Sequence, residues 1–296
     1  MSNNRNMVKA RSVKNDEFYT RYIDVDKELS SYNVEVFRGK TIYLPADKWD
    51  TKGTVPQSNF IRWFLDNKEL IGFDKLVATC ISFDEEYNYY EVVNIGGIYH
   101  EYYSRCVEDE EFTSGDFRSK FCKDILCNCD IIVTNPPFSL FLEFIDLVMS
   151  YNKQIITLGN STSVLTNQVF EYLKTGKLIL SDTVRSHGLD FEIGDEFGSV
   201  KNVGVRWYTT IQKSNNKHKD VEFIKRDLSN YEFYDNSDIL YIGGINEIPD
   251  DYWGYLALPI SIFDRNYKNK LEIVDSYVGS VDGEKKFARV ICKRVR

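Results

Sequence analysis

A short turn at residues 135–138 combines residue types and spacing that indicate chemistry. Asn135, Pro136, Pro137 and Phe138 follow directly after the apolar run of residues 131–134. Proline restricts the residue before it to extended conformations, and two successive prolines fix φ twice and remove two N–H donors. The result is a rigid turn that presents the Asn135 side-chain oxygen and the Pro136 carbonyl as neighbouring hydrogen-bond acceptors.

Two neighbouring acceptors match the two hydrogens of an aromatic amine. Hydrogen bonds at this point would stabilise the positive charge that grows on the amine nitrogen while it attacks a methyl donor. Phe138 would supply a ring on which a base extruded from a duplex can stack. An ordinary loop between a strand and a helix is the structural alternative, but the strand–turn–helix context around the motif favours the functional interpretation.

The elements that must position this turn alternate along the first half of the chain. Ser58 is a good N-cap for the amphipathic stretch that follows it, and Gly96-Gly97 predicts the turn of a hairpin within residues 84–114. Strands that alternate with helices indicate an α/β fold with a parallel sheet wrapped by crossover helices. The predicted strands are residues 41–44, 76–81, 131–134 and 154–158, and the predicted helices are residues 25–37, 117–128 and 138–150.

Three regions are expected along the chain. Residues 1–14 form a flexible basic arm, and residues 15–180 form a catalytic core that carries residues 84–114 as a hairpin insertion. Residues 181–296 contain the end of the core sheet, including a strand over 203–211, a further strand over 221–224, and an irregular recognition region.

Two aspartates are expected near the turn, because ligands of such sheets bind outside the carboxyl ends of the strands. Asp47 follows the first predicted strand, where an acid can meet the ribose or the amino-acid part of a nucleotide-like cofactor. Asp116 precedes a predicted helix and could accept a hydrogen bond from an adenine amine, with Phe117 packed on the ring. The alternative for each aspartate is an N-cap or a turn position.

Composition bounds the remaining possibilities. The chain has 296 residues and six cysteines, in spacings that fit no common zinc pattern, and only three histidines, so no metal site is expected. The sequence has no apolar run of the length that spans a bilayer, and we expect a cytoplasmic protein. A net charge of −8 argues against a simple basic nucleic-acid binder, yet basic residues cluster in 5–14, 213–226 and 285–296.

The chain resembles the EcoRI-type adenine-specific DNA methyltransferases from Asp16-Glu17-Phe18-Tyr19-Thr20 to Ala288-Arg289-Val290-Ile291. The strongest matches are residues 16–20, 115–119 and 133–141, and Gly159-Asn160 and Pro259-Ile260 add weaker support. The resemblance implies a Rossmann-like methyltransferase fold, with a mostly parallel twisted sheet and flanking helices. It also implies S-adenosyl-L-methionine as cofactor and double-stranded DNA as partner, with a restriction endonuclease as a functional counterpart and a monomeric state.

The same resemblance implies roles for individual residues. Tyr19 and Thr20 belong to a segment that closes over the methionine end of the cofactor, Asp47 is the aspartate after the first strand, and Asp116 with Phe117 binds the adenine of the cofactor. The catalytic tetrad maps onto Asn135, Pro136, Pro137 and Phe138, and Asn135 also borders the cofactor.

The sequence also departs from the family's pattern. No Gly-x-Gly loop follows the first predicted strand, and no acid stands in Thr79-Cys80-Ile81, where such enzymes hold the ribose. Asp84 and Glu85 are the nearest acids that could substitute. Methylation of a cytosine amine, of RNA or of a protein glutamine therefore stays open, as does an inactive DNA-binding protein on the same fold. Arg185, His187 and Arg206 are candidates for base recognition within residues 180–265, with ordinary surface charge as the alternative.

Overall fold

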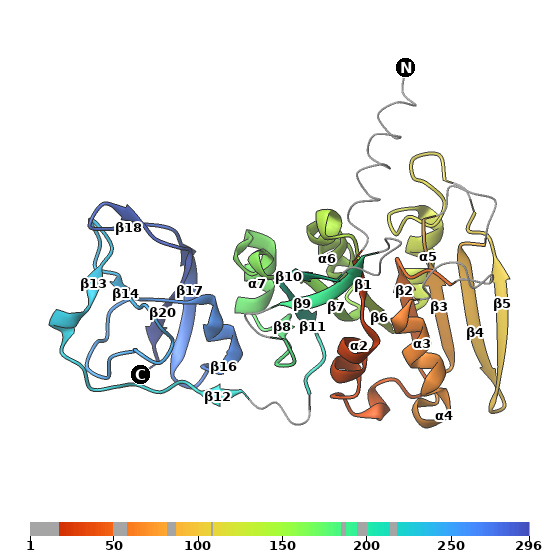
Figure 1. Cartoon of the computed structure of the whole chain (residues 1–296), viewed down its shortest axis with the longest axis horizontal. Helices are drawn as coiled ribbons and strands as arrows, with labels where there is room; N and C mark the ends of the chain where they lie inside the picture. The colour runs from red at the N-terminus through yellow and green to blue at the C-terminus, as the bar shows by residue number, and fades with distance from the viewer. Residues whose placement is uncertain are drawn as a thin grey trace, which may run out of the picture. The chain divides into compact units, whose positions relative to one another are not determined.

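A computed structural model of the chain describes residues 18–49, 58–81, 87–107, 109–184, 188–193, 200–213 and 218–295 (Figure 1). The chain divides into two compact units, of which the first contains Met1–Ser161 and His187–Asn215. The second unit contains Thr162–Ser186 and Asn216–Arg296. The expected boundary after residue 180 thus falls inside the second unit, because residues 162–186 pack with the C-terminal residues.

A mixed sheet forms the centre of the first unit, with strands in the order β5-β4-β3-β2-β6-β7-β11. Its middle strands β3, β2, β6 and β7 are parallel to one another. Strands β4, β5 and β11 run antiparallel to their neighbours. The expectation of a mostly parallel sheet was therefore too simple. The bounds are β2 Thr41–Pro45, β3 Lys75–Thr79, β4 Tyr89–Ile95, β5 Ile98–Ser104, β6 Ile131–Thr134, β7 Gln154–Asn160 and β11 Val205–Thr209.

The hairpin of β4 and β5 was predicted correctly, but it was expected as an insertion and not as part of the main sheet. Gly96 and Gly97 both adopt positive φ at its turn, as a tight hairpin requires. Strand β4 pairs with β3, with Tyr90 opposite Ala78, so the hairpin continues the main sheet and is not an insertion beside it.

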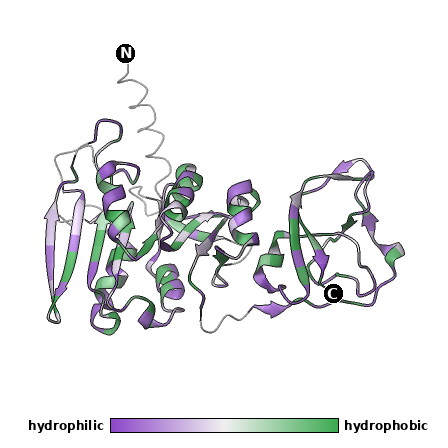
Figure 2. Ribbon diagram, turned by 180° about the vertical axis from the view of Figure 1, so that it is seen from behind, coloured by the Kyte–Doolittle hydropathy of each residue, from purple (hydrophilic) through white to green (hydrophobic). Residues whose placement is uncertain are grey.

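Helices cover both faces of this sheet (Figure 1). Neighbouring residues of a strand point to opposite faces, and in β11 the ring of Trp207 meets Phe60 of α3 whereas Tyr208 meets Phe141 of α6. Hydrophobic and hydrophilic residues alternate along these helices in Figure 2, and the buried residues of α3 are the apolar Phe60, Ile61, Trp63 and Phe64. The helices are α2 Tyr22–Leu29, α3 Asn59–Asp66, α4 Lys68–Ile71, α5 Lys120–Asn128 and α6 Phe141–Ser150.

Several predicted helices begin or end elsewhere. The helix expected over 25–37 is α2 followed by the 3-10 helix η1 Val34–Val36, and the one expected from 117 starts at Lys120. Ser119 caps α5 by accepting a hydrogen bond from the Cys122 backbone N–H at 3.2 Å. The helix expected from 138 opens with the 3-10 helix η2 Phe138–Leu140 before α6.

A small antiparallel sheet in the first unit joins segments far apart in sequence. Its order is β1 Phe18–Thr20, β9 Leu189–Ile193 and β10 Val200–Val203. The strand predicted over 203–211 is thus divided between β10 and β11, with Gly204 between them.

The second unit has a sheet and a core of its own. Tyr234, Ala257, Val281 and Ile291 form a buried apolar cluster on a sheet with the order β13-β14-β15-β20-β17. In place of the strand predicted over 221–224 there is only an isolated bridge between Ile224 and Pro249. The elements are η3 Ser161–Leu165, α7 Asn167–Lys174, β8 Ile179–Leu180, β12 Lys219–Asp220, η4 Leu228–Asn230, β13 Glu232–Phe233, β14 Leu240–Tyr241, β15 Leu256–Leu258, η5 Ile260–Asp264, β16 Arg265–Asn266, β17 Leu271–Tyr277, β18 Ser280–Val281, β19 Glu284–Lys285 and β20 Arg289–Arg294. Among the described residues, no helix has the length and apolar character needed to cross a membrane.

A buried ion pair connects α2 with the segment after β11. Glu28 has a side chain that is 0% exposed, and its Oε2 lies 3.1 Å from the Lys213 Nζ. The Tyr32 hydroxyl donates to the other carboxylate oxygen at 2.7 Å. Lys213 is therefore a structural residue, although the sequence places it in the basic cluster of residues 213–226.

Replacing Lys213 by methionine should lower the free energy of unfolding by about 3–5 kcal/mol, because Glu28 would stay buried without its counter-charge. Urea denaturation followed by circular dichroism measures this loss. Lys27→Met, an exposed lysine on the same helix, is the matched control and should change stability by less than about 0.5 kcal/mol. Equal urea midpoints for the two variants would show that the pair contributes nothing.

Candidate active site

The site lies where the order of strands reverses. The chain passes from β2 outward to β3 on one side, and from β6 outward to β7 on the other, so β2 and β6 are neighbours at a topological switch point. Ligands of open α/β sheets bind outside the carboxyl ends of the strands at such a point. Asp47 follows β2 and Asn135 follows β6, so the structure brings the two predicted residues to the same edge.

Asp47 is a buried carboxylate that is hydrogen-bonded to the last residue of β6 and to the N-cap residue of α3. Its side chain accepts a hydrogen bond from the Thr134 hydroxyl at 2.7 Å and another from the Ser58 hydroxyl at 2.5 Å. Ser58 also caps α3, as predicted, by accepting from the Phe60 backbone N–H at 3.2 Å. Burial raises the pKa of Asp47 to about 6, although the two hydroxyl donors act in the opposite direction.

The turn between β2 and Asp47 has the shape of a glycine turn without a glycine. Ala46 has a φ of 121°, in the region that only glycine adopts readily. The backbone N–H groups of Ala46 and Asp47 both donate to the Thr79 carbonyl, at 2.8 and 3.1 Å. These bonds to the end of β3 hold a conformation that costs about 1–3 kcal/mol at a non-glycine residue.

The Asn-Pro-Pro-Phe turn is fixed at both ends. The carbonyl of the fully buried Thr134 accepts from the Thr157 hydroxyl of β7 at 3.0 Å. Pro136 is buried, whereas Asn135, Pro137 and Phe138 are partly exposed. Phe138 meets Phe191 of β9 edge-on, with ring centroids 5.8 Å apart.

The N-terminal strand β1 closes the site from another direction. Thr20 pairs with Phe191 in the small sheet, and its carbonyl accepts from the Asn59 side chain of α3 at 2.8 Å. Asn59 is next to Ser58, so this contact places the Tyr19–Thr20 segment beside Asp47. The Thr20 hydroxyl is buried and has no hydrogen-bond partner among the described residues, which leaves it available for a ligand.

Asp116 is held near the end of β3 by a glycine. Gly115 has a φ of +83°, and a Cβ at this residue would lie 1.9 Å from the Cys80 carbonyl oxygen. The Asp116 side chain is buried and accepts from the Arg118 guanidinium at 2.9 and 2.7 Å. One oxygen also accepts from the Arg118 backbone N–H at 2.9 Å, which is the turn geometry named above as the alternative role. Each carboxylate oxygen has more than one lone pair, so Asp116 keeps capacity to accept from a ligand.

Phe117 is buried in this structure. Its ring is 5% exposed and packs edge-on against Phe144 of α6, with centroids 5.2 Å apart. The sequence did not show this packing, and a role for Phe117 beside a bound ring stays a prediction.

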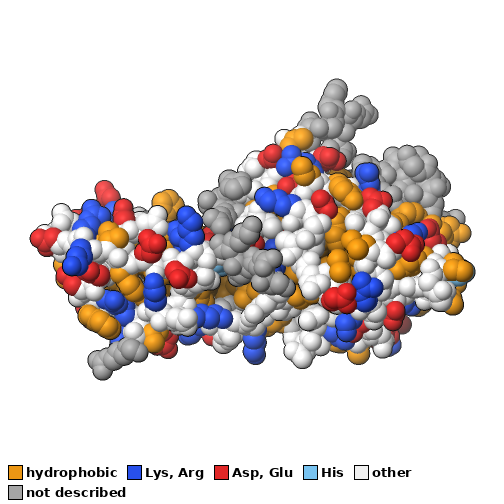
Figure 3. Space-filling model, turned by 90° about the horizontal axis from the view of Figure 1, so that it is seen from below, with side chains coloured by type: hydrophobic (Ala, Val, Ile, Leu, Met, Phe, Trp, Pro, Cys, Tyr) orange, Lys and Arg blue, Asp and Glu red, His pale blue; other side chains and the backbone are white. Residues whose placement is uncertain are grey.

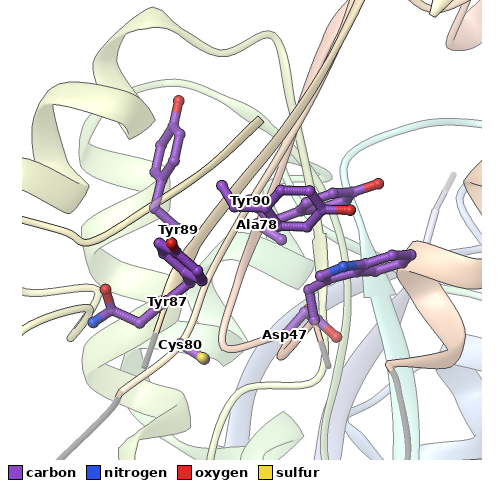
Figure 4. A pocket seen from close by; sticks show the side chains of 9 residues that line it. Asp47, Ala78, Cys80, Tyr87, Tyr89 and Tyr90 are labelled. Atoms are coloured by element: carbon purple, nitrogen blue, oxygen red, sulfur yellow. The ribbon is translucent and has the colours of Figure 1, made fainter. Parts of the chain in front are cut away.

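A pocket at the same sheet edge contains residues that the sequence did not single out. Asp47, Ala78 and Cys80 line it together with aromatic side chains of the β4–β5 hairpin, including Tyr87 and Tyr90 (Figure 4). Trp49, two residues after Asp47, belongs to the same lining. The tyrosine-rich composition of residues 87–103 was the available signal.

The structure describes one of the three residues that the sequence suggested for base recognition. Arg185 and His187 lie outside the described residues. Arg206 is 1% exposed within β11, so in this structure it is neither a surface charge nor a side chain that can reach a base. No group of three or more potential metal ligands occurs among the described residues.

A buried carboxylate beside an Asn-Pro-Pro-Phe turn at the switch point of an α/β sheet defines a site suited to methyl transfer onto an amine. The family model of the adenine-specific methyltransferase EcoRI matches residues 6–295. The chain belongs to this family. It is 30% identical to the type II methyltransferase M.EcoRI of Escherichia coli, over 99% of this chain and 97% of that protein.

Two mycoplasma proteins are also similar. The chain is 27% identical to the type II methyltransferase M.MgeORF184P of Mycoplasma genitalium, over 97% of this chain and 98% of that protein. It is 28% identical to the type II methyltransferase M.MpnI of Mycoplasma pneumoniae, with 97% of each chain covered. No solved structure matches this chain.

Gly115→Ala should disrupt the site more than an ordinary glycine substitution, because the new Cβ would overlap the Cys80 carbonyl. Gly39→Ala is the matched control, since Gly39 has a φ of +65° and a Cβ there would meet no atom within 4 Å. The control should cost about 1 kcal/mol of stability, and Gly115→Ala at least about 2 kcal/mol more. Thermal unfolding compares them, and equal losses would mean that the close approach is not required.

Proposed function

We propose that this chain is a sequence-specific DNA methyltransferase that transfers a methyl group from S-adenosyl-L-methionine to the exocyclic amine of a flipped-out adenine. The hydrogen bond between Thr134 and Asp47 carries the proposal, because it joins the turn suited to an amine to the acid suited to a cofactor. Membership of an adenine-specific family, and relatives named as type II methyltransferases, support adenine in DNA over a cytosine amine, RNA or a protein glutamine.

The described residues fit the proposed cofactor. When bound, S-adenosylmethionine supplies an electrophilic methyl group on a positively charged sulfur. The buried Asp47 carboxylate is suited to the ammonium or hydroxyl donors of such a molecule, and the unpartnered Thr20 hydroxyl to its carboxylate. Asp116, at the end of β3, is suited to the amine of its adenine ring. These buried polar groups favour an active enzyme over an inactive binder, which would not need them.

Asn135 and Pro136 would hold the target amine. Their oxygens accept its two hydrogens, which directs the nitrogen lone pair toward the methyl group and stabilises the developing positive charge. Phe138 would stack on the flipped base, and Phe191 would fix the ring of Phe138 from the side.

The second unit is the proposed recognition region for DNA. Lys285 and Lys293 are exposed there. The Arg294 Cζ lies 4.1 Å from the centroid of the Phe223 ring and 4.3 Å from that of the Trp253 ring, so this side chain is held in the fold. On the face in Figure 3, Lys and Arg side chains are interspersed with Asp and Glu. A few phosphate contacts, and not one broad basic area, would provide sequence-independent affinity. We further propose a monomer with a restriction endonuclease as its functional counterpart.

Asn135→Ala should lower the single-turnover rate of DNA methylation at least a hundredfold while the dissociation constants for DNA and cofactor change less than threefold. This pattern follows if the contact strengthens only in the transition state. Transfer of a labelled methyl group to duplex DNA measures the rate, and Asn128→Ala, an exposed asparagine at the end of α5, is a control for changes of the same residue type. A near wild-type rate in Asn135→Ala would refute the proposed role.

Cofactor affinity should fall below about pH 6, because the cofactor needs the Asp47 carboxylate and protons compete for it below its raised pKa. The amine of the cofactor stays protonated over this range, so the loss should approach tenfold per pH unit. Calorimetry between pH 5 and pH 7 tests it on wild type and on Asp47→Asn, which should bind weakly without this pH dependence. A wild-type affinity that is constant over this range would exclude the contact.

A further inference from the structure

An aromatic row crosses the sheet next to Asp47. Ala78 of β3 pairs with Tyr90 of β4, and Tyr90 pairs with Tyr103 of β5, so these three side chains lie on one face in adjacent strands. Because Ala78 is small, it leaves space beside Tyr90. The Trp49 indole occupies that space, as part of the same pocket lining.

Trp49 and Tyr90 form a parallel stack. Their ring centroids are 4.3 Å apart with an angle of 1° between the planes, and Tyr103 meets Tyr90 at 5.1 Å. Tyr90 is 2% exposed and therefore supports the stack from within, whereas Trp49 is partly exposed. A flat, preformed aromatic surface thus lies two residues from the buried carboxylate.

The surroundings of this surface are those of a nucleoside site. Asp47 borders the pocket from β2, and Cys80 and Asn88 border it from the end of β3 and the start of β4. Gly115 packs against the Cys80 carbonyl, which brings the Asp116 loop to the same place. No acid stands within residues 79–81 at the end of β3, and the aromatic side chains of this pocket are suited to provide affinity for the nucleoside half of a cofactor.

We propose that the adenine ring of the methyl donor stacks on the Trp49 indole, with Tyr90 and Tyr103 as its support. The inference rests on the proposed function, because it assumes an adenosine-containing cofactor. Stacking on an aromatic side chain does not depend on the hydrogen-bonding groups at the edge of the base. It strengthens binding roughly tenfold or more per base.

The experiment measures binding of S-adenosylmethionine, S-adenosylhomocysteine and 5′-methylthioadenosine by calorimetry, with the full chain. Trp49→Leu should weaken all three ligands by the same factor, about tenfold, because all three carry adenine. Trp49→Phe should retain most of the affinity, since a ring remains. Trp253→Leu, an exposed tryptophan of the second unit, is the matched control and should bind all three like wild type.

Tryptophan fluorescence gives an independent readout. Each ligand should change the emission of the wild type, and this change should be lost in Trp49→Phe, because Trp63 and Trp207 are buried in the core and Trp253 belongs to the second unit. This comparison decides the matter if Trp49→Leu does not fold.

Three results would overturn the inference. Wild-type affinity of a folded Trp49→Leu for all three ligands would exclude stacking, and an unchanged fluorescence response in Trp49→Phe would do the same. Weakening of S-adenosylmethionine alone would assign the indole to the positively charged sulfur and not to adenine. Binding of S-adenosylmethionine by the wild type tests the proposed function separately, so each of these results leaves that function intact.

Discussion

The site depends on one buried carboxylate and the hydroxyl group that reaches it across the sheet. Asp47 lies two residues after the end of β2, Thr134 is the last residue of β6, and the 2.7 Å hydrogen bond between them joins the two strand ends at the switch point. A buried carboxylate is costly without donors, and Asp47 has two hydroxyl donors, one from Thr134 and one from Ser58. The bond thereby fixes the end of β6, which Asn135 follows, relative to Asp47 after β2.

The rest of the first unit holds other segments against this pair. Strand β1 reaches the site because it pairs with β9, and Phe191 of β9 then contacts Phe138 of the catalytic turn. Gly115 brings a third loop to the end of β3, where a side chain would not fit. Residues 18–20 and 189–193 therefore reach the motif at 135–138, and residues 115–116 reach the end of β3, although no local signal in the sequence connects these segments.

Local signals explain which parts were predictable from the sequence. Strand β6 was predicted with its observed bounds, because three apolar residues and Thr134 come shortly before a proline pair that ends regular structure, and Gly96-Gly97 located the hairpin turn. The sequence did not show that β4 would pair with β3, because register is decided by neighbours far along the chain. For the same reason it missed the burial of Phe117, Lys213 and Arg206, whose partners or packing are distant in sequence.

The alanine at the turn after β2 and the side chains that follow it are physically connected. A glycine-rich turn lets a ligand approach the backbone closely, whereas the Cβ of Ala46 restricts that approach even though its φ of 121° preserves the turn. Binding energy that the backbone cannot provide must then come from side chains nearby. Asp47 and Trp49 follow in the next three residues, and the β4–β5 hairpin adds Tyr90 as backing. This explains why the hairpin continues the main sheet: only a strand paired with β3 can place a tyrosine opposite Ala78 and beneath the indole.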